Sequence, residues 1–439
     1  MHLQLGELPT VVITTADLAQ EVFKTHDLLF LDRPQSQTTK IVCYEWKDLA
    51  FAPYGDYWRE LRKICTLQLL SSKRVKSFQS IREEEVSKLI RKVCAMAGSP
   101  FNVSESVFSG MNDVTSSAAF GKKCKDKEAF LSATRAIIEL GQGGLQVFDL
   151  FPSLEVLSVI IGLKPKLEKL HRVHDKIFDD IISEHLVNKG KFANERRSEF
   201  EQDLVDVLLS LQEGTELQTP ITMDNIKAVI VDIFIAGTET SSSVVEWAMA
   251  EMMRNQRVLK KAQTEVRRAM QGKAAVDETE IQELTYLKSV IKETLRLHPS
   301  LPLLLPRKCR EACEIGGYVI PKGTQVIINA WAIGRDPESW PDAESFVPER
   351  FDGINSADFN GNNFGFIPFG AGRRRCPGVS FGMATIELML AHLLYHFDWE
   401  LPTGIKPEEL DMKESFGSTV RRKNDLYLIP TPYCPSLEK

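Results

Sequence analysis

The chain has 439 residues, of which 43% are hydrophobic and 26% are charged, and its formal net charge at pH 7 is -6. This composition is ordinary for a globular protein and excludes a disordered chain, and the acidic balance argues against nucleic acid as the main partner. Its eight cysteines are scattered over the whole length, which is typical of reduced thiols and not of a small disulfide scaffold.

The first residues predict a β-hairpin, with strands over 3–5 and 11–13 and a turn that contains Gly6 and Pro9. Because the hairpin starts at the first residues, we expect that an upstream segment has been removed. The chain has no run of about 18 apolar residues, and it has no internal repeat or Pro/Ser-rich linker. We therefore expect one continuous domain over residues 1–439.

The longest predicted helix runs from Thr222 to Arg254. At 1.5 Å per residue it is about 50 Å long, enough to cross the whole molecule. Spacing places Thr240 on its apolar stripe. Glu239 falls on the opposite, polar side, together with Asp232 and Glu246. The apolar stripe consists of Ile226, Val229, Ile230, Ile233, Gly237, Val244 and Ala248.

Short strands are predicted after Pro299. Residues 315–328 alternate β-branched residues with turn formers, and one further strand is expected over 426–429. Between them, residues 335–375 are dense in Pro, Gly, Asp and Asn, and an irregular stretch of that length tends to be functional. Since residues 56–300 carry mostly helical spacing, the expected fold class is mainly α with small β-sheets (α+β).

A cysteine lies at the end of this irregular stretch. Cys376 is surrounded by Gly370, Gly372 and Gly378 and precedes a helical run over 380–396. Backbone N–H groups, the helix dipole and the neighbouring arginines favour a thiolate there. A thiolate bound to haem iron donates electron density that favours O–O cleavage. The alternative is a buried structural cysteine beside an ordinary basic turn.

The loop matches a known signature in full, Phe369-x-x-Gly372-x-Arg374-x-Cys376-x-Gly378. It resembles the haem-binding signature of the cytochrome P-450 superfamily of haem-thiolate monooxygenases. The resemblance covers the whole chain, and residues 51–59 and 330–337 are similar to plant microsomal members. It implies the cytochrome P-450 fold, in which haem b (iron protoporphyrin IX) lies between one long helix above and the Cys376 loop beneath, with the Cys376 thiolate as the axial ligand of the metal.

The string Ala236-Gly237-Thr238-Glu239-Thr240-Ser241 resembles the oxygen-activation motif of the same superfamily. The resemblance implies that Ala236 and Gly237 open a groove for dioxygen and that the Thr240 alcohol helps to deliver protons. It also assigns a proton-path role to Glu239, although spacing puts this acid off the apolar stripe. The alternative for Thr240 is a hydroxyl that bonds the carbonyl one turn earlier.

Further family motifs imply cofactor contacts and a structural network. Trp58, Arg62, Arg307 and Arg374 match residues that hold the haem propionates, as guanidinium groups should when carboxylates are bound. Phe369 belongs to the haem-binding loop. Glu293 and Arg296 match a pair that meets an arginine of a Pro-Glu-Arg-Phe string, here Arg350, in a network that braces the haem face. Without this resemblance, Glu293 and Arg296 would be a surface ion pair worth a few tenths of a kcal/mol.

The predicted substrate pocket is apolar and poor in polar groups. The resemblance implies hydroxylation or oxidation of a small hydrophobic plant metabolite of secondary metabolism, with a terpenoid as the first expectation and an alkaloid or flavonoid as alternatives. The predicted pocket residues are Ile233, Ala236, Gly237, Leu301, Leu303, Leu304 and Ser418.

The resemblance also implies partners. O₂ and electrons from NADPH are the co-substrates, and the electrons arrive through NADPH–cytochrome P-450 reductase, with cytochrome b5 as an optional second donor. Such enzymes lie on the cytosolic face of the endoplasmic reticulum membrane, held by an N-terminal helix and a hinge, which we expect to belong to the removed upstream segment, and we expect a monomer. The basic residues Arg59, Lys63, Lys73, Arg74 and Lys76 form either a solvated face or a docking surface for an acidic reductase.

Two other functions remain open at this point. A haem-thiolate isomerase or lyase would need no external electrons, but such members typically lack the alcohol that Thr240 supplies. A catalytically silent haem-binding protein would keep Cys376 and would need neither Thr240 nor a reductase.

Overall fold

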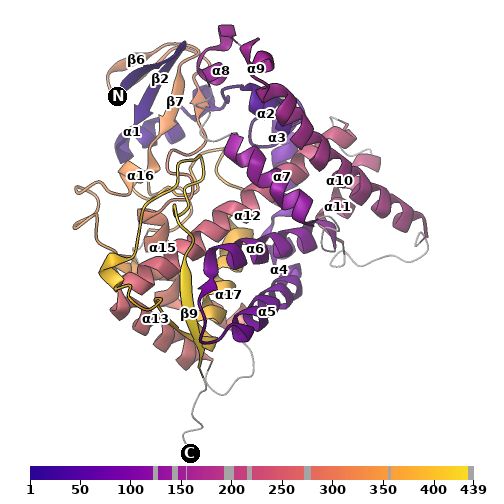
Figure 1. The fold of residues 1–439 in the computed structure, drawn as a ribbon. Coiled ribbons are helices and arrows are strands. Elements are labelled where there is room, and N and C mark those ends of the chain that lie inside the picture. Colours follow the sequence, from indigo (N-terminus) through magenta and orange to yellow (C-terminus); the bar gives the residue numbers. More distant parts are fainter. Residues whose placement is uncertain are drawn as a thin grey trace, which may run out of the picture.

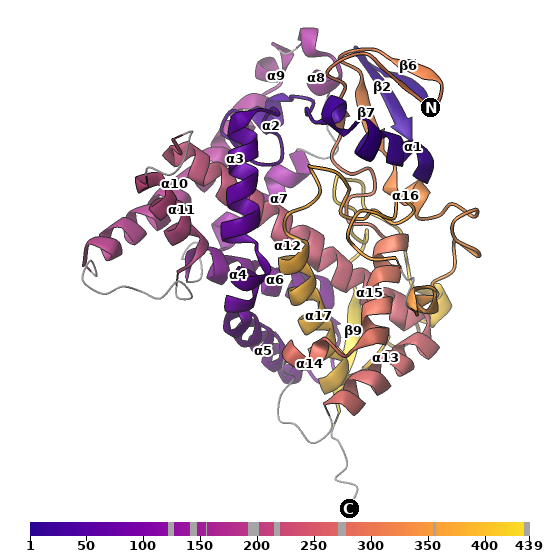
Figure 2. The same cartoon turned by 180° about the vertical axis from the view of Figure 1, so that it is seen from behind.

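Helices surround one long central helix, α12 (Met223–Arg254), and the small sheets lie at the edges of the molecule (Figures 1 and 2). This arrangement confirms the predicted fold class. The structure is a computed structural model and describes residues 1–121, 127–140, 147–154, 156–191, 202–214, 220–270, 278–353 and 357–433.

The predicted N-terminal hairpin is confirmed and forms part of a four-stranded sheet. β1 (His2–Leu5) pairs antiparallel with β2 (Leu8–Ile13), which pairs parallel with β7 (Gln325–Ile328), and β7 pairs with β4 (Arg307–Lys308). This sheet joins the first residues to the segment that follows the helical region. The other strands are β5 (Cys313–Ile315) with β6 (Tyr318–Ile320), and β3 (Phe101–Asn102), β9 (Tyr427–Pro432) and β8 (Phe397–Glu400).

The helices occupy most of residues 16–297, as their spacing predicts. The α-helices before α12 are α1 (Ala16–Gln20), α2 (Gln37–Val42), α3 (Asp56–Ile64), α4 (Ser72–Ser77), α5 (Gln79–Ala95), α6 (Val103–Phe120), α7 (Lys127–Leu140), α8 (Val147–Leu150), α9 (Leu157–Ile160), α10 (Leu163–Lys191) and α11 (Leu204–Glu213). Those after it are α13 (Gln256–Ala269), α14 (Glu278–Ile281), α15 (Thr285–Leu297), α16 (Ala330–Ile333) and α17 (Val379–His396). Short π or 3-10 turns cover Glu21–Thr25, Asp27–Phe30, Cys65–Leu69, Pro152–Leu154, Pro348–Phe351 and Pro407–Glu409.

The ends of α12 are set by local sequence. Thr222 caps the first turn in a capping box with Asn225, so N–H groups that lack a helical partner are satisfied. Among the helices in the described ranges, α12 alone is long and apolar enough to span a membrane, and 61% of its most apolar window is buried inside the protein. Such burial is typical of the core helix of a folded domain.

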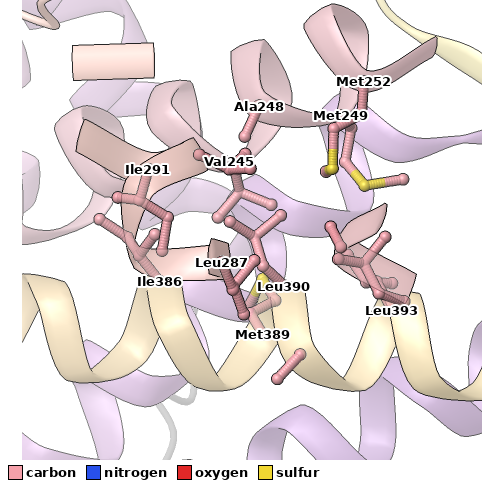
Figure 3. Close-up of a cluster of buried hydrophobic side chains, with 14 of the residues drawn as sticks. Val245, Ala248, Met249, Met252, Leu287, Ile291, Ile386, Met389, Leu390 and Leu393 are labelled. Carbon is pink, nitrogen blue, oxygen red and sulfur yellow. The ribbon is translucent and has the colours of Figure 1, made fainter. Parts of the chain in front are cut away.

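A hydrophobic core fixes α12 against α15 and α17 (Figure 3). Side chains of the three helices point toward one another, with Val245 and Met249 from α12, Leu287 from α15, and Met389 and Leu390 from α17. α17 is apolar on nearly all sides, which is typical of a buried helix. The core therefore holds the helix that follows Cys376 in a fixed position below α12.

The cysteines agree with the expectation of reduced thiols. Six of them, Cys43, Cys65, Cys94, Cys309, Cys313 and Cys376, lie within the described residues and are free. Cys124 and Cys434 lie outside the described residues.

Candidate active site

The loop that carries Cys376 is shaped by two glycines. Gly370 and Gly372 both have φ of +68°, a conformation that residues with a side chain rarely adopt. A Cβ on Gly372 would lie 2.4 Å from Oδ1 of the buried Asp27. The turn brings the Cys376 N–H within 3.0 Å of the Phe369 carbonyl oxygen, to which it donates. The loop is therefore closed by its own backbone and places Cys376 just before α17.

Opposing effects act on the Cys376 thiol. The Gly378 N–H and the Arg62 and Arg375 guanidiniums lower its pKa, in the direction that the sequence predicts, but burial is the larger effect and raises the pKa above its ordinary value. Arg62 also donates to the Arg375 carbonyl at 2.6 Å, which ties α3 to the loop. In this protein environment the thiolate is thus favoured only when a further positive charge compensates for its burial.

A cavity of about 250 Å³ separates the cysteine loop from α12. Cys376 from the loop and Thr240 from α12 both line it, and most of its remaining wall is apolar. The structure brings together at this cavity the predicted residues Trp58, Arg62, Ile233, Ala236, Gly237, Thr240, Leu301, Leu304, Arg307, Phe369, Arg374 and Cys376.

Two predicted pocket residues were placed wrongly. Ser418 is exposed and Leu303 is 46% exposed, and neither lines this cavity. Val420, two residues after Ser418, is fixed to α12 instead: its N–H donates to the Ser300 carbonyl at 2.9 Å, and its carbonyl accepts from the Ser243 hydroxyl at 2.9 Å. This anchoring leaves Ser418 in solvent, while Leu305, which the sequence analysis missed, lines the cavity.

Thr240 faces the cavity through a hydrogen-bonded alcohol. Its hydroxyl donates to the Ala236 carbonyl at 2.6 Å, so the alternative of a hydroxyl that bonds the carbonyl one turn earlier is also true. Its own carbonyl accepts a hydrogen bond of 2.9 Å from the Ser300 hydroxyl. Gly237, the residue after Ala236, also lines the cavity. The alcohol is therefore held at the point where the helix meets the cavity.

Glu239 lies on the opposite side of α12, as its spacing predicts. It lines a second, polar cavity of about 50 Å³ that also contains Glu246, Arg135 and Arg421. Its Oε2 is buried and accepts no hydrogen bond from any residue that the structure describes. Burial raises the pKa of Glu239 to about 7, although Arg421 and Arg135 partly offset this effect.

The third acid of the predicted polar side is placed differently. Asp232 lines the large cavity and not the polar one, because it accepts the N–H groups of Leu49 and Ala50 at 2.7 and 3.3 Å. The segment that follows α2 packs against this turn of α12. Asp232, which helical spacing places on the polar side of the helix, therefore makes an internal contact. Helical spacing alone could not indicate this partner.

Buried cations form one wall of the cavity. Arg374 donates to the carbonyls of Leu49 and Ala50 at 3.3 and 3.2 Å, and its guanidinium lies 4.5 Å from the Trp58 ring. Arg307 donates to Asp27 Oδ1 at 3.3 Å. The sequence analysis missed Asp27 and also Arg33, which lines the same wall and donates to the Leu305 carbonyl at 2.6 Å.

These cations fit the carboxylate groups of a bound cofactor. Burial lowers the pKa values of Arg307 and Arg374 to about 10, and the pKa of Arg33 is lowered by burial and by both of these neighbours. Arg374 Nε is buried and has no hydrogen-bond partner among the described residues. Anionic oxygens at this wall would relieve the mutual repulsion and satisfy this nitrogen.

The predicted Glu293 network is buried. Arg296 donates to both carboxylate oxygens of Glu293 at 2.7 and 2.8 Å, and both side chains are fully buried, so the pair is not a surface ion pair. Arg350 donates to Glu293 at 3.3 Å. Arg296 further donates to the carbonyls of Gly334 and Ala343. The network therefore ties α15 to residues 334–350, the first half of the irregular stretch.

The predicted basic cluster loses one member. Arg74 is buried and donates to the carbonyls of Gln68 and Gln202, so it holds two chain segments together. The prediction that Arg74 belongs to an exposed basic cluster was therefore wrong. The remaining exposed cations are Arg59, Lys63, Lys73 and Lys76.

Comparisons with known proteins agree with this geometry. A family model described as Cytochrome P450 matches residues 1–429. Among curated proteins, the chain is 58% identical to desmethyl-deoxy-podophyllotoxin synthase of Sinopodophyllum hexandrum, covering 98% of this chain and 84% of that protein. It is 53% identical to premnaspirodiene oxygenase of Hyoscyamus muticus (100% and 87%) and 50% identical to germacrene A hydroxylase of Barnadesia spinosa (99% and 85%).

Solved structures show the same fold. A zebra fish cytochrome P450 in a structure with abiraterone superposes with a TM-score of 0.82 at 24% identity, covering 99% of this chain and 95% of that chain.

Proposed function

Since the chain belongs to the cytochrome P450 family and is a monooxygenase, we propose that it inserts one oxygen atom from O₂ into a small terpenoid bound in the cavity between Cys376 and Thr240. One observation carries this proposal: a single, largely apolar cavity is lined both by the cysteine of the loop and by an alcohol of α12. An apolar wall with few polar groups suits a hydrocarbon or a weakly oxygenated molecule.

The cofactor implied by the family is haem with a thiolate ligand. Cys376 would bind the iron, and Trp58, Arg62, Arg307 and Arg374 would hold the propionates. This fit is supported by the crowded guanidiniums and by Arg374 Nε, which has no partner within the described part of the chain. When bound, thiolate-ligated haem supplies the activation of O₂. The protein's own contribution is to orient the substrate on the apolar wall and to supply protons from the side of α12.

A substrate screen tests the proposed function. The holoenzyme should be titrated with premnaspirodiene and germacrene A, and then supplied with NADPH and NADPH–cytochrome P450 reductase. We expect an absorption shift of the haem on binding and an oxygenated product that requires the reductase. Because the relative from Sinopodophyllum hexandrum is 58% identical, a podophyllotoxin-type phenolic is the second candidate. Turnover of this compound alone would replace the terpenoid assignment and leave the monooxygenase chemistry in place.

The Thr240 alcohol is proposed to pass protons toward bound oxygen. Thr240→Ala removes the hydroxyl that now bonds the Ala236 carbonyl. We expect haem content to be unchanged and product formed per NADPH to fall about tenfold, since general acid groups of this kind contribute roughly a hundredfold or more when fully used. Product and NADPH are measured together. Thr240→Ser, which keeps the hydroxyl, is the matched control, and equal coupling in all three proteins would remove this role.

Glu239 is proposed to hold a proton for this delivery from the polar cavity. With its pKa raised to about 7 by burial, the acid is protonated below that pH and loses its proton above it. We therefore expect product per NADPH to decline as pH rises through about 7. Glu239→Gln should give low coupling that no longer varies over this range. A variant with the wild-type pH profile would show that another group supplies the proton.

The electron donor is proposed to be NADPH–cytochrome P450 reductase, docking on the side of the molecule where α3 meets the cysteine loop. Family members generally use a redox partner. Lys63 on α3 is exposed, and its neighbour Arg62 bonds the backbone of the loop. Positive charge there would attract an acidic partner and would make turnover sensitive to salt.

We propose that the protein lies on the endoplasmic reticulum membrane, in keeping with the typically microsomal location of plant relatives. Exposed apolar side chains gather around α9, where Val156, Ile160 and Ile161 are 71%, 72% and 66% exposed. Figure 1 shows α8, α9 and β6 at one end of the molecule, and Tyr318 and Val319 of β6 are also exposed. An apolar surface of this kind is typical of membrane or partner contact.

Vesicle flotation tests this membrane contact. The chain should float with phosphatidylcholine vesicles, and the double substitution Ile160→Glu and Ile161→Glu should lower the bound fraction severalfold. Val187→Glu, at an exposed apolar position on α10, is the control and should have no effect. Equal flotation of both variants would contradict the assignment of this surface.

A further inference from the structure

Two buried acids hold one wall of the substrate cavity. Asp232 on α12 accepts the N–H groups of Leu49 and Ala50, and Asp48 accepts the N–H of Phe51 at 3.0 Å. Leu49 and Ala50 in turn line the cavity. The acids therefore satisfy three successive N–H groups of the segment 48–51. Asp232 attaches the segment to the central helix, and Asp48 closes a turn within it.

The opposite edge of the same segment is held by cations. The Leu49 carbonyl accepts from Trp58 Nε1 at 3.0 Å and from Arg374, and the Ala50 carbonyl accepts from Arg33 at 3.1 Å. The segment thus lies between the cationic wall and α12. Any shift of the segment's N–H edge, which bonds the two acids, would change the shape of the cavity.

The two acids face each other, and the Cys43 thiol lies beside them within hydrogen-bonding reach of Asp48. Asp48 is completely buried, and its Oδ1 accepts no hydrogen bond from any described N–H or O–H group. The Asp232 carboxyl lies within hydrogen-bonding reach of the Asp48 carboxyl. Two facing carboxylates in a buried site repel each other strongly unless a proton lies between them.

We infer that Asp48 and Asp232 share one proton and together act as positioning residues, a clasp that holds segment 48–51 on α12 and thereby sets the shape of the substrate cavity. The inference deepens the proposed function, because it rests on this cavity being the substrate site. Burial raises the pKa values of both carboxyl groups, and Asp48 raises that of Asp232 further, in agreement with a retained proton.

Other groups around the pair do not titrate at moderately alkaline pH. Cys43 beside α2, Tyr57 on α3 and Cys65 face the acids, and their pKa values are raised by burial, that of Cys65 to about 12. Arg33 and Arg374 are the cations that act on Asp48. As pH rises through the raised pKa of the pair, the shared proton leaves, two negative charges face each other, and the clasp should loosen.

Hydrogen exchange of the holoenzyme tests this inference directly. Exchange of the amides of residues 49–51, corrected for intrinsic rates, is followed from pH 6.5 to 9. The wild type should lose about tenfold protection across this range, and its affinity for clotrimazole, used as a cavity probe, should fall in parallel. Asp48→Asn and Asp232→Asn should keep protection and lose its pH dependence, because an amide N–H replaces the shared proton.

Two further variants complete the test. Asp232→Ala removes the acceptor and should expose these amides at every pH. Asp224→Asn removes only the exposed ion pair of the same helix with Lys47 and should behave as wild type. The inference of a shared proton would be overturned if amide protection in the wild type did not vary with pH. It would also be overturned if the Asn variants kept the wild-type pH dependence. Neither readout requires product formation, so this failure is distinct from a failure of the proposed function.

Discussion

Cys376→Ser is expected to lower product formation about a thousandfold or more, which corresponds to roughly 4 kcal/mol of activation free energy. A serine hydroxyl is similar in size but is a far weaker electron donor than a thiolate, and donation from sulfur favours O–O cleavage. Cys376 lies at the cavity between Arg62 and the start of α17, so the substitution changes the donor and little else.

The reduced protein in carbon monoxide provides the measurement for this variant. Wild-type protein should show the Soret band of an intact thiolate complex, and Cys376→Ser should lack it. Cys65→Ser is the matched control, because Cys65 also lines the cavity but lies in a π turn after α3 and not in the glycine loop. A thiolate spectrum that survives in Cys376→Ser and disappears in Cys65→Ser would reassign the ligand.

Glu293→Ala is expected to destabilise the protein by roughly 3–5 kcal/mol and to cause loss of bound haem during purification. The change leaves the fully buried Arg296 without its carboxylate partner. It also removes the acceptor of the Val347 N–H, which bonds Glu293 at 2.8 Å. Residues 334–350, which this network holds, should then lose their fixed position.

Thermal unfolding and haem content measure this effect. Arg296→Ala should behave like Glu293→Ala, since it leaves the buried carboxylate unpaired. Arg257→Ala is the control, because Arg257 is mostly exposed and bonds Glu349 on the same Pro348–Phe351 turn. If the buried variants were as stable as this surface variant, the network would have no structural role.

Local sequence was sufficient for the parts of the site that are local in the chain. The cysteine loop could be predicted because Gly370, Gly372 and Cys376 lie within one short loop that leads directly into α17. The long helix could be predicted because its cap and apolar stripe lie within its own residues. Glu293 and Arg296 are three residues apart on one helix, although only the structure shows that they are buried.

Contacts between distant segments could not be predicted. Arg33 bonds the Leu305 carbonyl across 272 positions, and Asp27 bonds Arg307 across 280. Asp232 has the spacing of a solvent-facing residue, but its partners come from the segment after α2. Ser418 was expected in the cavity, but it is exposed, and Val420 two residues later is the residue that bonds α12.

The central claim is that one oxygen atom of O₂ enters an apolar molecule held between Cys376 and Thr240. The most direct test is the mass of the product formed by the holoenzyme with NADPH, its reductase and isotopically heavy dioxygen in ordinary water. The account predicts one heavy oxygen atom in each product molecule. A product whose new oxygen comes from water, or a rearranged product that gains no oxygen, would contradict it.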